Sequence, residues 1–228
     1  EVCDEYKDGN KSEDIYDIDS DANVDEKVNY ATNWINIIGP SSLITTETAS
    51  DYDYLENEVR TAVAPQVAII DKQADDKTAK VTVQINNNYS GTISGVRILG
   101  KIPTEKNTFV LNQRELGSMY STTMMGKIEV PEELKDITKV YYSVKENPTN
   151  DLADVNNEWT STVTDWAKVK SYLIDLGDYK LEKSTECNFA YKIQIPDTVK
   201  YNDIAYSTHA VYFYLETDEG KLADKTGT

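Results

Sequence analysis

Alternating acidic residues near the N-terminus form the one candidate metal site that the sequence offers. Side chains spaced two apart in a loop can wrap a hard cation such as Ca²⁺, which takes about six to eight oxygen ligands. An EF-hand loop, however, would carry glycine in place of Ala22 and glutamate in place of Val28. Calcium is therefore a possible cofactor, and a solvated acidic linker is the favoured interpretation. The candidate ligands are Asp17, Asp19, Asp21, Asn23 and Asp25.

Nucleophilic catalysis would have to use the single histidine, His209, as its base. Cys187 is the cysteine that could serve as the nucleophile beside this base. Both residues, however, occupy positions that alternate with polar ones, as core residues of strands do. Carboxylates are abundant, so a hydrolase with an Asp/Glu pair stays a weaker alternative, although no particular pair stands out. We predict no catalytic residues and no enzymatic activity.

Tryptophans offer the candidate ligand-binding site. Trp159 and Trp166 lie close together in sequence, next to amide and carboxylate groups such as Asn156 and Asp165. Exposed aromatic faces flanked by such acceptors could stack on sugar rings. The favoured alternative is that one tryptophan fills the core while the 16 tyrosines line positions between strands.

Charge and cysteine content narrow the class of protein. The 23 basic and 40 acidic residues give a net charge of −17, so nucleic acid is excluded as a default partner. No apolar run approaches the roughly 20 residues that span a bilayer, which predicts no direct membrane insertion. Cys3 and Cys187 are too few for a disulfide framework, and whether they pair is left open. The chain begins without methionine or a secretion signal, as a mature or excised fragment would.

Strand patterns dominate the rest of the chain and predict its organisation. Residues 1–27 are an acidic tail or linker. Residues 28–65 hold two candidate strands, at 28–38 and 42–48, of uncertain domain membership. From residue 66 onward, period-2 alternation becomes clear, with a short helix possible within 156–170. The expected strands of the 66–228 domain are 79–85, 95–102, 137–144, 187–195 and 207–215. Such an all-β pattern predicts an antiparallel β-sandwich.

The order of these segments resembles Ig-like repeat modules of Gram-positive bacterial surface proteins of the adhesin and pilin type. The resemblance covers roughly residues 66–228 and is one of pattern. It is carried by Ala79–Asn87, Ser94–Pro103, Tyr172–Tyr179, Phe189–Pro196 and Tyr206–Leu215. It implies an Ig-like sandwich in an extracellular, cell-wall-associated protein.

Related modules often carry a spontaneous Lys–Asn bond, formed beside a buried acid. Lys72 stands where the resemblance would place the amine, but Ser207, Thr208 and His209 stand where the acceptor asparagine is usual. We therefore expect no such cross-link, and a solvated Lys72.

Together, the residues and the resemblance predict a non-enzymatic extracellular module that acts as adhesin or stalk. The expected partners are neighbouring modules and a surface protein or glycan of a host or neighbouring cell. The main alternative is a carbohydrate-binding module that uses Trp159 and Trp166.

Overall fold

A computed structural model describes residues 11–13, 27–29, 43–51, 77–200 and 203–227. The chain divides into two compact units, Glu1–Gly39 and Pro40–Thr228. In the first unit, β1 (Lys11–Glu13) pairs antiparallel with β2 (Lys27–Asn29). The predicted strand at 28–38 overlaps β2 only at its start, and the remainder of that range lies outside the described residues.

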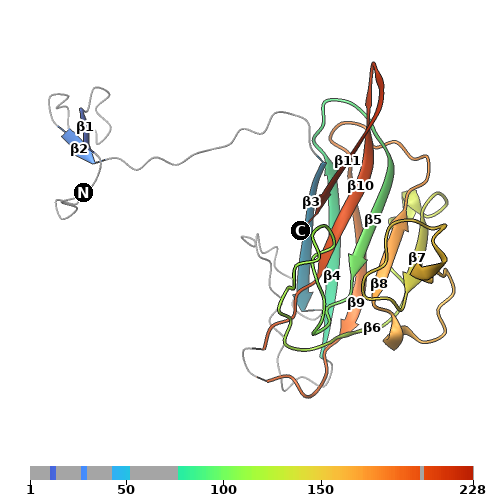
Figure 1. Cartoon of the computed structure of the whole chain (residues 1–228). Coiled ribbons are helices and arrows are strands. Elements are labelled where there is room, and N and C mark those ends of the chain that lie inside the picture. The colour runs from blue at the N-terminus through green and yellow to red at the C-terminus, as the bar shows by residue number, and fades with distance from the viewer. Residues whose placement is uncertain (1–10, 14–26, 30–42, 52–76, 201–202, 228) are drawn as a thin grey trace. The chain divides into compact units, whose positions relative to one another are not determined.

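Two antiparallel sheets build the second unit (Figure 1). The four-stranded sheet has the order β3 (Leu43–Asp51), β4 (Thr78–Asn87), β9 (Glu186–Gln194), β6 (Thr123–Met124). The five-stranded sheet has the order β11 (Gly220–Gly227), β10 (Thr208–Thr217), β5 (Ile93–Lys101), β8 (Ser171–Asp175), β7 (Lys139–Ser143). The prediction of an all-β, sandwich-like architecture is confirmed. The segment 28–65 contributes β3 to the same sheet as β4.

One hydrophobic core joins the inner faces of the two sheets. Alternate residues of β4, β9 and β10 enter it, as the period-2 pattern predicts. Cys187 and His209 both lie on these buried faces. Each large apolar side chain buried in this way contributes about 1.5–3 kcal/mol to stability.

A second, smaller cluster covers part of the outer face of the five-stranded sheet. Leu99, Leu173 and Ala210 come from its three central strands, and side chains of the connecting loops pack over them. The middle of this sheet is thus covered on both sides, which explains why β10 carries large side chains on both faces. Farther along the same face, Tyr214 of β10 is 44% exposed.

Several local features differ from the sequence prediction, and β6 and β8 are two strands that it did not include. β11 was not expected, because Gly220–Gly227 lacks an alternating apolar pattern; it is an exposed edge strand that forms by pairing with β10. The possible helix within 156–170 is instead two single turns of 3-10 helix, η3 (Val155–Asn157) and η4 (Trp166–Lys168). A third such turn is η2 (Glu132–Leu134).

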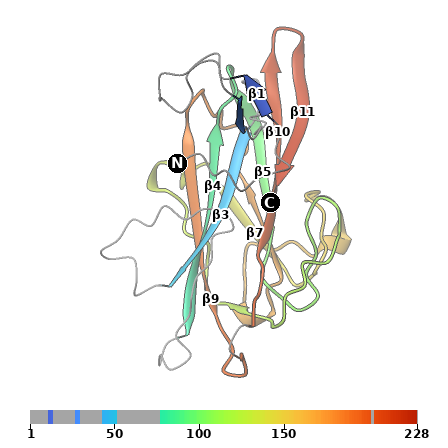
Figure 2. The ribbon, with the colours of Figure 1, turned by 90° about the vertical axis from the view of Figure 1, so that its left-hand side faces the viewer.

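The first and last strands of the sandwich run in the same direction (Figures 1 and 2). Leu43 begins β3 opposite Asn87, at the end of the sandwich where β5 starts. Leu215 of β10 pairs with both Ile93 and Leu222, so the start of β11 lies at this same end. β3 and β11 therefore both lead away from it.

Candidate functional site

A buried polar cluster joins the two sheets through the single histidine. His209 of β10 is 0% exposed, and its Nδ1 lies 2.9 Å from Oε2 of Glu47 on β3, whose side chain is 6% exposed. The other ring nitrogen, Nε2, forms a hydrogen bond with Oγ1 of Thr45, also on β3. We call Glu47, His209 and Thr45 the cross-sheet clamp. It connects the edge strand of one sheet to the interior of the other.

Two buried tyrosines extend the clamp into the core. The Tyr191 hydroxyl donates to Oε1 of Glu47 at 3.3 Å, and the rings of Tyr172 and Tyr191 have centroids 5.2 Å apart. Burial raises the pKa of each tyrosine well above its usual range, and the charge of Glu47 raises it further. Both hydroxyls therefore remain neutral. Tyr172 lies directly over Gly100, whose missing side chain leaves room for the ring.

The clamp has the connectivity of a hydroxyl–imidazole–carboxylate triad. Its hydroxyl is engaged elsewhere, however, because Thr45 Oγ1 also donates to the carbonyl oxygen of Gln84 at 3.1 Å. His209 exposes no surface to a substrate. This arrangement suits a structural cross-link between sheets better than nucleophilic catalysis.

Cys187 is a poor nucleophile in this fold. Burial raises the pKa of its thiol to about 11, with smaller contributions from Glu133 and Glu186, so the reactive thiolate is scarce at neutral pH. Cys187 pairs with Ile85 in the four-stranded sheet, whereas His209 belongs to the other sheet.

Trp159 and Trp166 pack in different places. Trp159 lies in the cluster on the outer face, and its Nε1 donates to the carbonyl oxygen of Thr149 at 3.1 Å. Trp166 packs against the inter-sheet core, edge to face with Tyr142 at a centroid distance of 5.0 Å. The structure does not bring the two rings into one cluster.

Several other predicted residues lie outside the described part of the chain. These are Cys3, Lys72 and the five candidate calcium ligands Asp17, Asp19, Asp21, Asn23 and Asp25. Within the described ranges, no group of three or more His, Cys, Asp or Glu side chains is placed to hold a metal ion.

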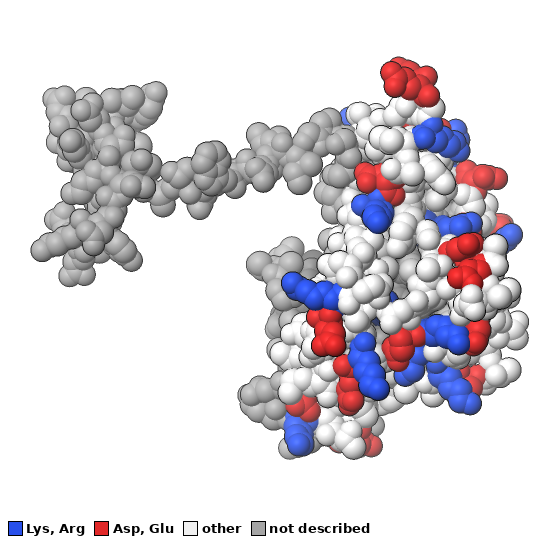
Figure 3. Space-filling model, viewed as in Figure 1, with Lys and Arg blue, Asp and Glu red and all other residues white. Residues whose placement is uncertain are grey.

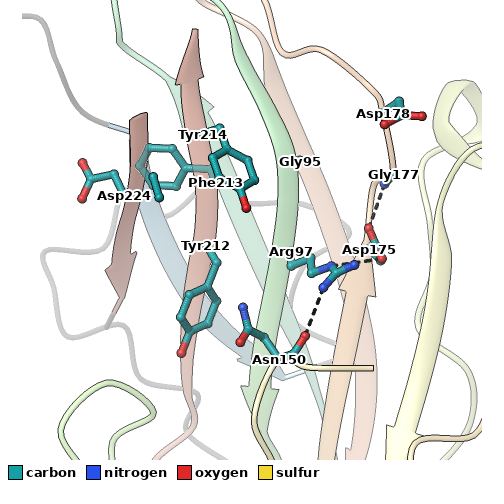
Figure 4. A pocket seen from close by; sticks show the side chains of 11 residues that line it. Gly95, Arg97, Asn150, Asp175, Gly177, Asp178, Tyr212, Phe213, Tyr214 and Asp224 are labelled. Carbon is teal, nitrogen blue, oxygen red and sulfur yellow. Dashed lines mark hydrogen bonds and ion pairs between the residues drawn. The ribbon is translucent and has the colours of Figure 1, made fainter. Parts of the chain in front are cut away.

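A groove of about 470 Å³ lies on the open part of the outer face of the five-stranded sheet (Figure 4). Arg97 of β5 crosses its floor, with Nε 3.1 Å from Oδ2 of Asp175 and a terminal nitrogen 3.3 Å from the carbonyl oxygen of Asn150. No sequence pattern predicted this site, because its residues come from four strands and two loops. Its lining also includes Gly95, Gly177, Asp178, Tyr212, Phe213, Tyr214, Ala223 and Asp224.

Lys101 is a buried lysine at the end of β5 that sequence reasoning did not single out. Its ammonium group donates to the carbonyl oxygen of Thr108 at 2.9 Å, to Oγ1 of the same residue at 2.8 Å and to Oδ1 of Asn147 at 2.6 Å. All three donors of the amine are thus satisfied, and two loops are tied to the strand. Burial lowers its pKa to about 8, although the charge of Glu146 partly opposes the change.

We expect Lys101 to make stability increase with pH in alkaline solution. An unfolded lysine has a pKa of about 10.4, so between pH 8 and 10.5 the unfolded chain binds more protons than the folded one. The free energy of unfolding of the wild type, minus that of Lys101→Met, should rise by about 1–3 kcal/mol from pH 7 to about pH 10.5. Urea denaturation at both pH values measures this difference. A constant or falling difference would refute the assignment.

Charge is mixed on the surface that Figure 3 displays. Basic and acidic side chains are interspersed there, and acidic ones gather at the tip where β10 turns into β11, at Asp218 and Glu219. No continuous basic stripe is visible among the described residues of this face.

No helix in the described part of the chain is long and apolar enough to cross a membrane. Compared with protein-family models and with curated proteins, the chain matches none.

Proposed function

We propose that the chain is a non-enzymatic, Ig-like module of an extracellular, cell-wall-associated bacterial protein, where it serves as stalk or adhesin. The observation that carries this proposal is the parallel course of β3 and β11, the first and last strands of the sandwich. In this function the module needs no cofactor. Its partners are neighbouring modules and a protein or glycan on another cell surface.

Parallel terminal strands determine how a load acts on the sandwich. A pull on the two ends of the chain enters β3 at Leu43 and leaves β11 at Gly227, so it runs along both strands in opposite senses. Inter-strand hydrogen bonds are perpendicular to the strands. The nine residues of β3 and the eight of β11 are therefore loaded together in shear.

The cross-sheet clamp supports the same function. An edge strand such as β3 is held by one neighbouring strand, β4, on one side only. The bonds from Glu47 and Thr45 to His209 attach it in addition to β10 of the other sheet. Because β10 also pairs with β11, the clamp links the strand that receives the load to the one that passes it on.

Single-molecule force spectroscopy tests the proposal in two pulling geometries. The first applies force to the two ends of the full chain, and the second to attachment points at residues 207 and 227, which peels β11 from β10 one residue pair at a time. We expect unfolding forces several-fold higher in the first geometry, because shear breaks many hydrogen bonds at once. Equal forces in the two geometries would contradict a load-bearing function.

A further inference from the structure

The groove on the outer face depends on an irregularity between β5 and β10. Tyr212 pairs with Arg97 but Tyr214 pairs with Ser94, so β5 has one residue more than β10 between these pairs. Gly95 lies in this bulge with φ = +60°, a left-handed conformation that favours glycine. Without a side chain at position 95, the ring of Tyr214 can lie directly against the strand.

The result is an aromatic side chain on open surface next to a hydrogen-bonding floor (Figure 4). Tyr214 is 44% exposed although it packs over Gly95. Tyr212, beside it on β10, is partly buried by the outer cluster. Burial raises the pKa of Tyr212, so its hydroxyl stays neutral and can both donate and accept.

Polar groups of both kinds line the groove. Arg97 offers a guanidinium fork that is already oriented by Asp175 and by the backbone of Asn150. The carboxylate of Asp175 lies against it as an acceptor, and those of Asp178 and Asp224 lie farther away, at the margins of the groove. A ligand that presents hydroxyl groups, each of which donates and accepts, can satisfy both kinds of partner.

The charges select against the other ligand classes. The one guanidinium of the groove is already paired with Asp175, and Asp178 and Asp224 add two more negative charges to the lining, which disfavours phosphate, sulfate and acidic sugars. The guanidinium on the floor disfavours a cationic side chain, which would have to approach Arg97. An uncharged ligand with an apolar face and many hydroxyl groups is left.

We propose that this groove binds a neutral glycan, with the ring of Tyr214 stacked on a pyranose and the Arg97–Asp175 pair hydrogen-bonded to its hydroxyl groups. This inference rests on the adhesive role proposed above and gives that role a site and a ligand class. It places the aromatic contact on β10 rather than at Trp159 and Trp166.

An array of neutral oligosaccharides, followed by calorimetric titration of those that bind, tests the proposal on the full chain. Tyr214→Ala should weaken binding about tenfold or more, as loss of a central aromatic contact does. Arg97→Lys keeps the charge but loses the fork, and should weaken binding as well. The matched control is Tyr206→Ala, because Tyr206 is 40% exposed but does not line the groove. Circular dichroism verifies that each variant is folded.

Binding of a neutral oligosaccharide that is weakened in Tyr214→Ala and Arg97→Lys but kept in Tyr206→Ala would support the proposal. Three results would overturn it: no neutral oligosaccharide bound at millimolar concentration, unchanged binding by both groove variants, or binding of oligolysine alone. Force spectroscopy uses no glycan, so a failure here is distinguishable from a failure of the load-bearing function.

Discussion

Glu47→Ala is expected to lower the free energy of unfolding by about 2–6 kcal/mol, because two buried polar groups lose their partner and each such loss costs about 1–3 kcal/mol. The substitution leaves Nδ1 of His209 without its carboxylate in a site that is fully buried. It also removes the acceptor of the Tyr191 hydroxyl. Buried groups that lose their partners keep the full cost of desolvation.

Urea denaturation at neutral pH measures this effect. Glu129→Ala is the control, because Glu129 forms an ion pair with Lys80 at 2.8 Å but is exposed. Exposed pairs contribute at most about 1 kcal/mol. A loss of stability for Glu47→Ala no larger than that of Glu129→Ala would show that the clamp does not hold β3 in place.

Gly100→Ala is the second substitution with a large expected effect. A methyl group at this position would collide with Cζ and Oη of Tyr172, which is itself fully buried. The ring cannot move outward, because it packs against Tyr191 and lies within the inter-sheet core. Overpacking of a close-packed core costs about 1–3 kcal/mol, and we expect the upper end here because the obstacle is a rigid ring.

Gly126→Ala provides the matched control for Gly100→Ala. A methyl group at Gly126 meets no atom within 4 Å, and the backbone there has no positive φ. Its stability should stay within about 0.5 kcal/mol of the wild type. Thermal unfolding followed by circular dichroism compares the two variants. If both variants have the melting temperature of the wild type, Tyr172 does not occupy the space over Gly100.

Much of the sandwich could be predicted from local alternation. The pattern in β9 correctly assigned Phe189 and Tyr191 to the core, and the pattern in β10 did the same for His209. β11 escaped prediction because its pairing with β10, rather than its own sequence, makes it a strand. β8 was missed as well, because its residues are buried on both faces and show no alternation, and so was the two-residue β6. Local alternation therefore identifies strands with one buried face and misses exposed, very short and doubly buried ones.

The clamp could not be predicted, because no spacing rule links its members. Glu47 and His209 are 162 positions apart and meet only because β3 and β10 face each other across the core. The alternating pattern of β10 correctly indicated that His209 is buried, but it could not indicate which residue is its partner.

The candidate ligand-binding site at Trp159 and Trp166 shows the same limit of prediction from sequence spacing. Trp159 and Trp166 are neighbours in sequence, yet the turns η3 and η4 direct them to different hydrophobic clusters. Each turn is capped by an aspartate side chain, Asp154 or Asp165, that accepts a backbone N–H. Proximity along an irregular segment does not fix which way its side chains point.

Native-state hydrogen exchange tests most directly whether β3 is an integral part of the sandwich. The β3 amides that donate to β4 should exchange only through global unfolding, with the same free energy as amides of β4 and β9. In Glu47→Ala their protection should fall first. Exchange of the wild-type β3 amides through a local opening several kcal/mol below the global value would contradict the account.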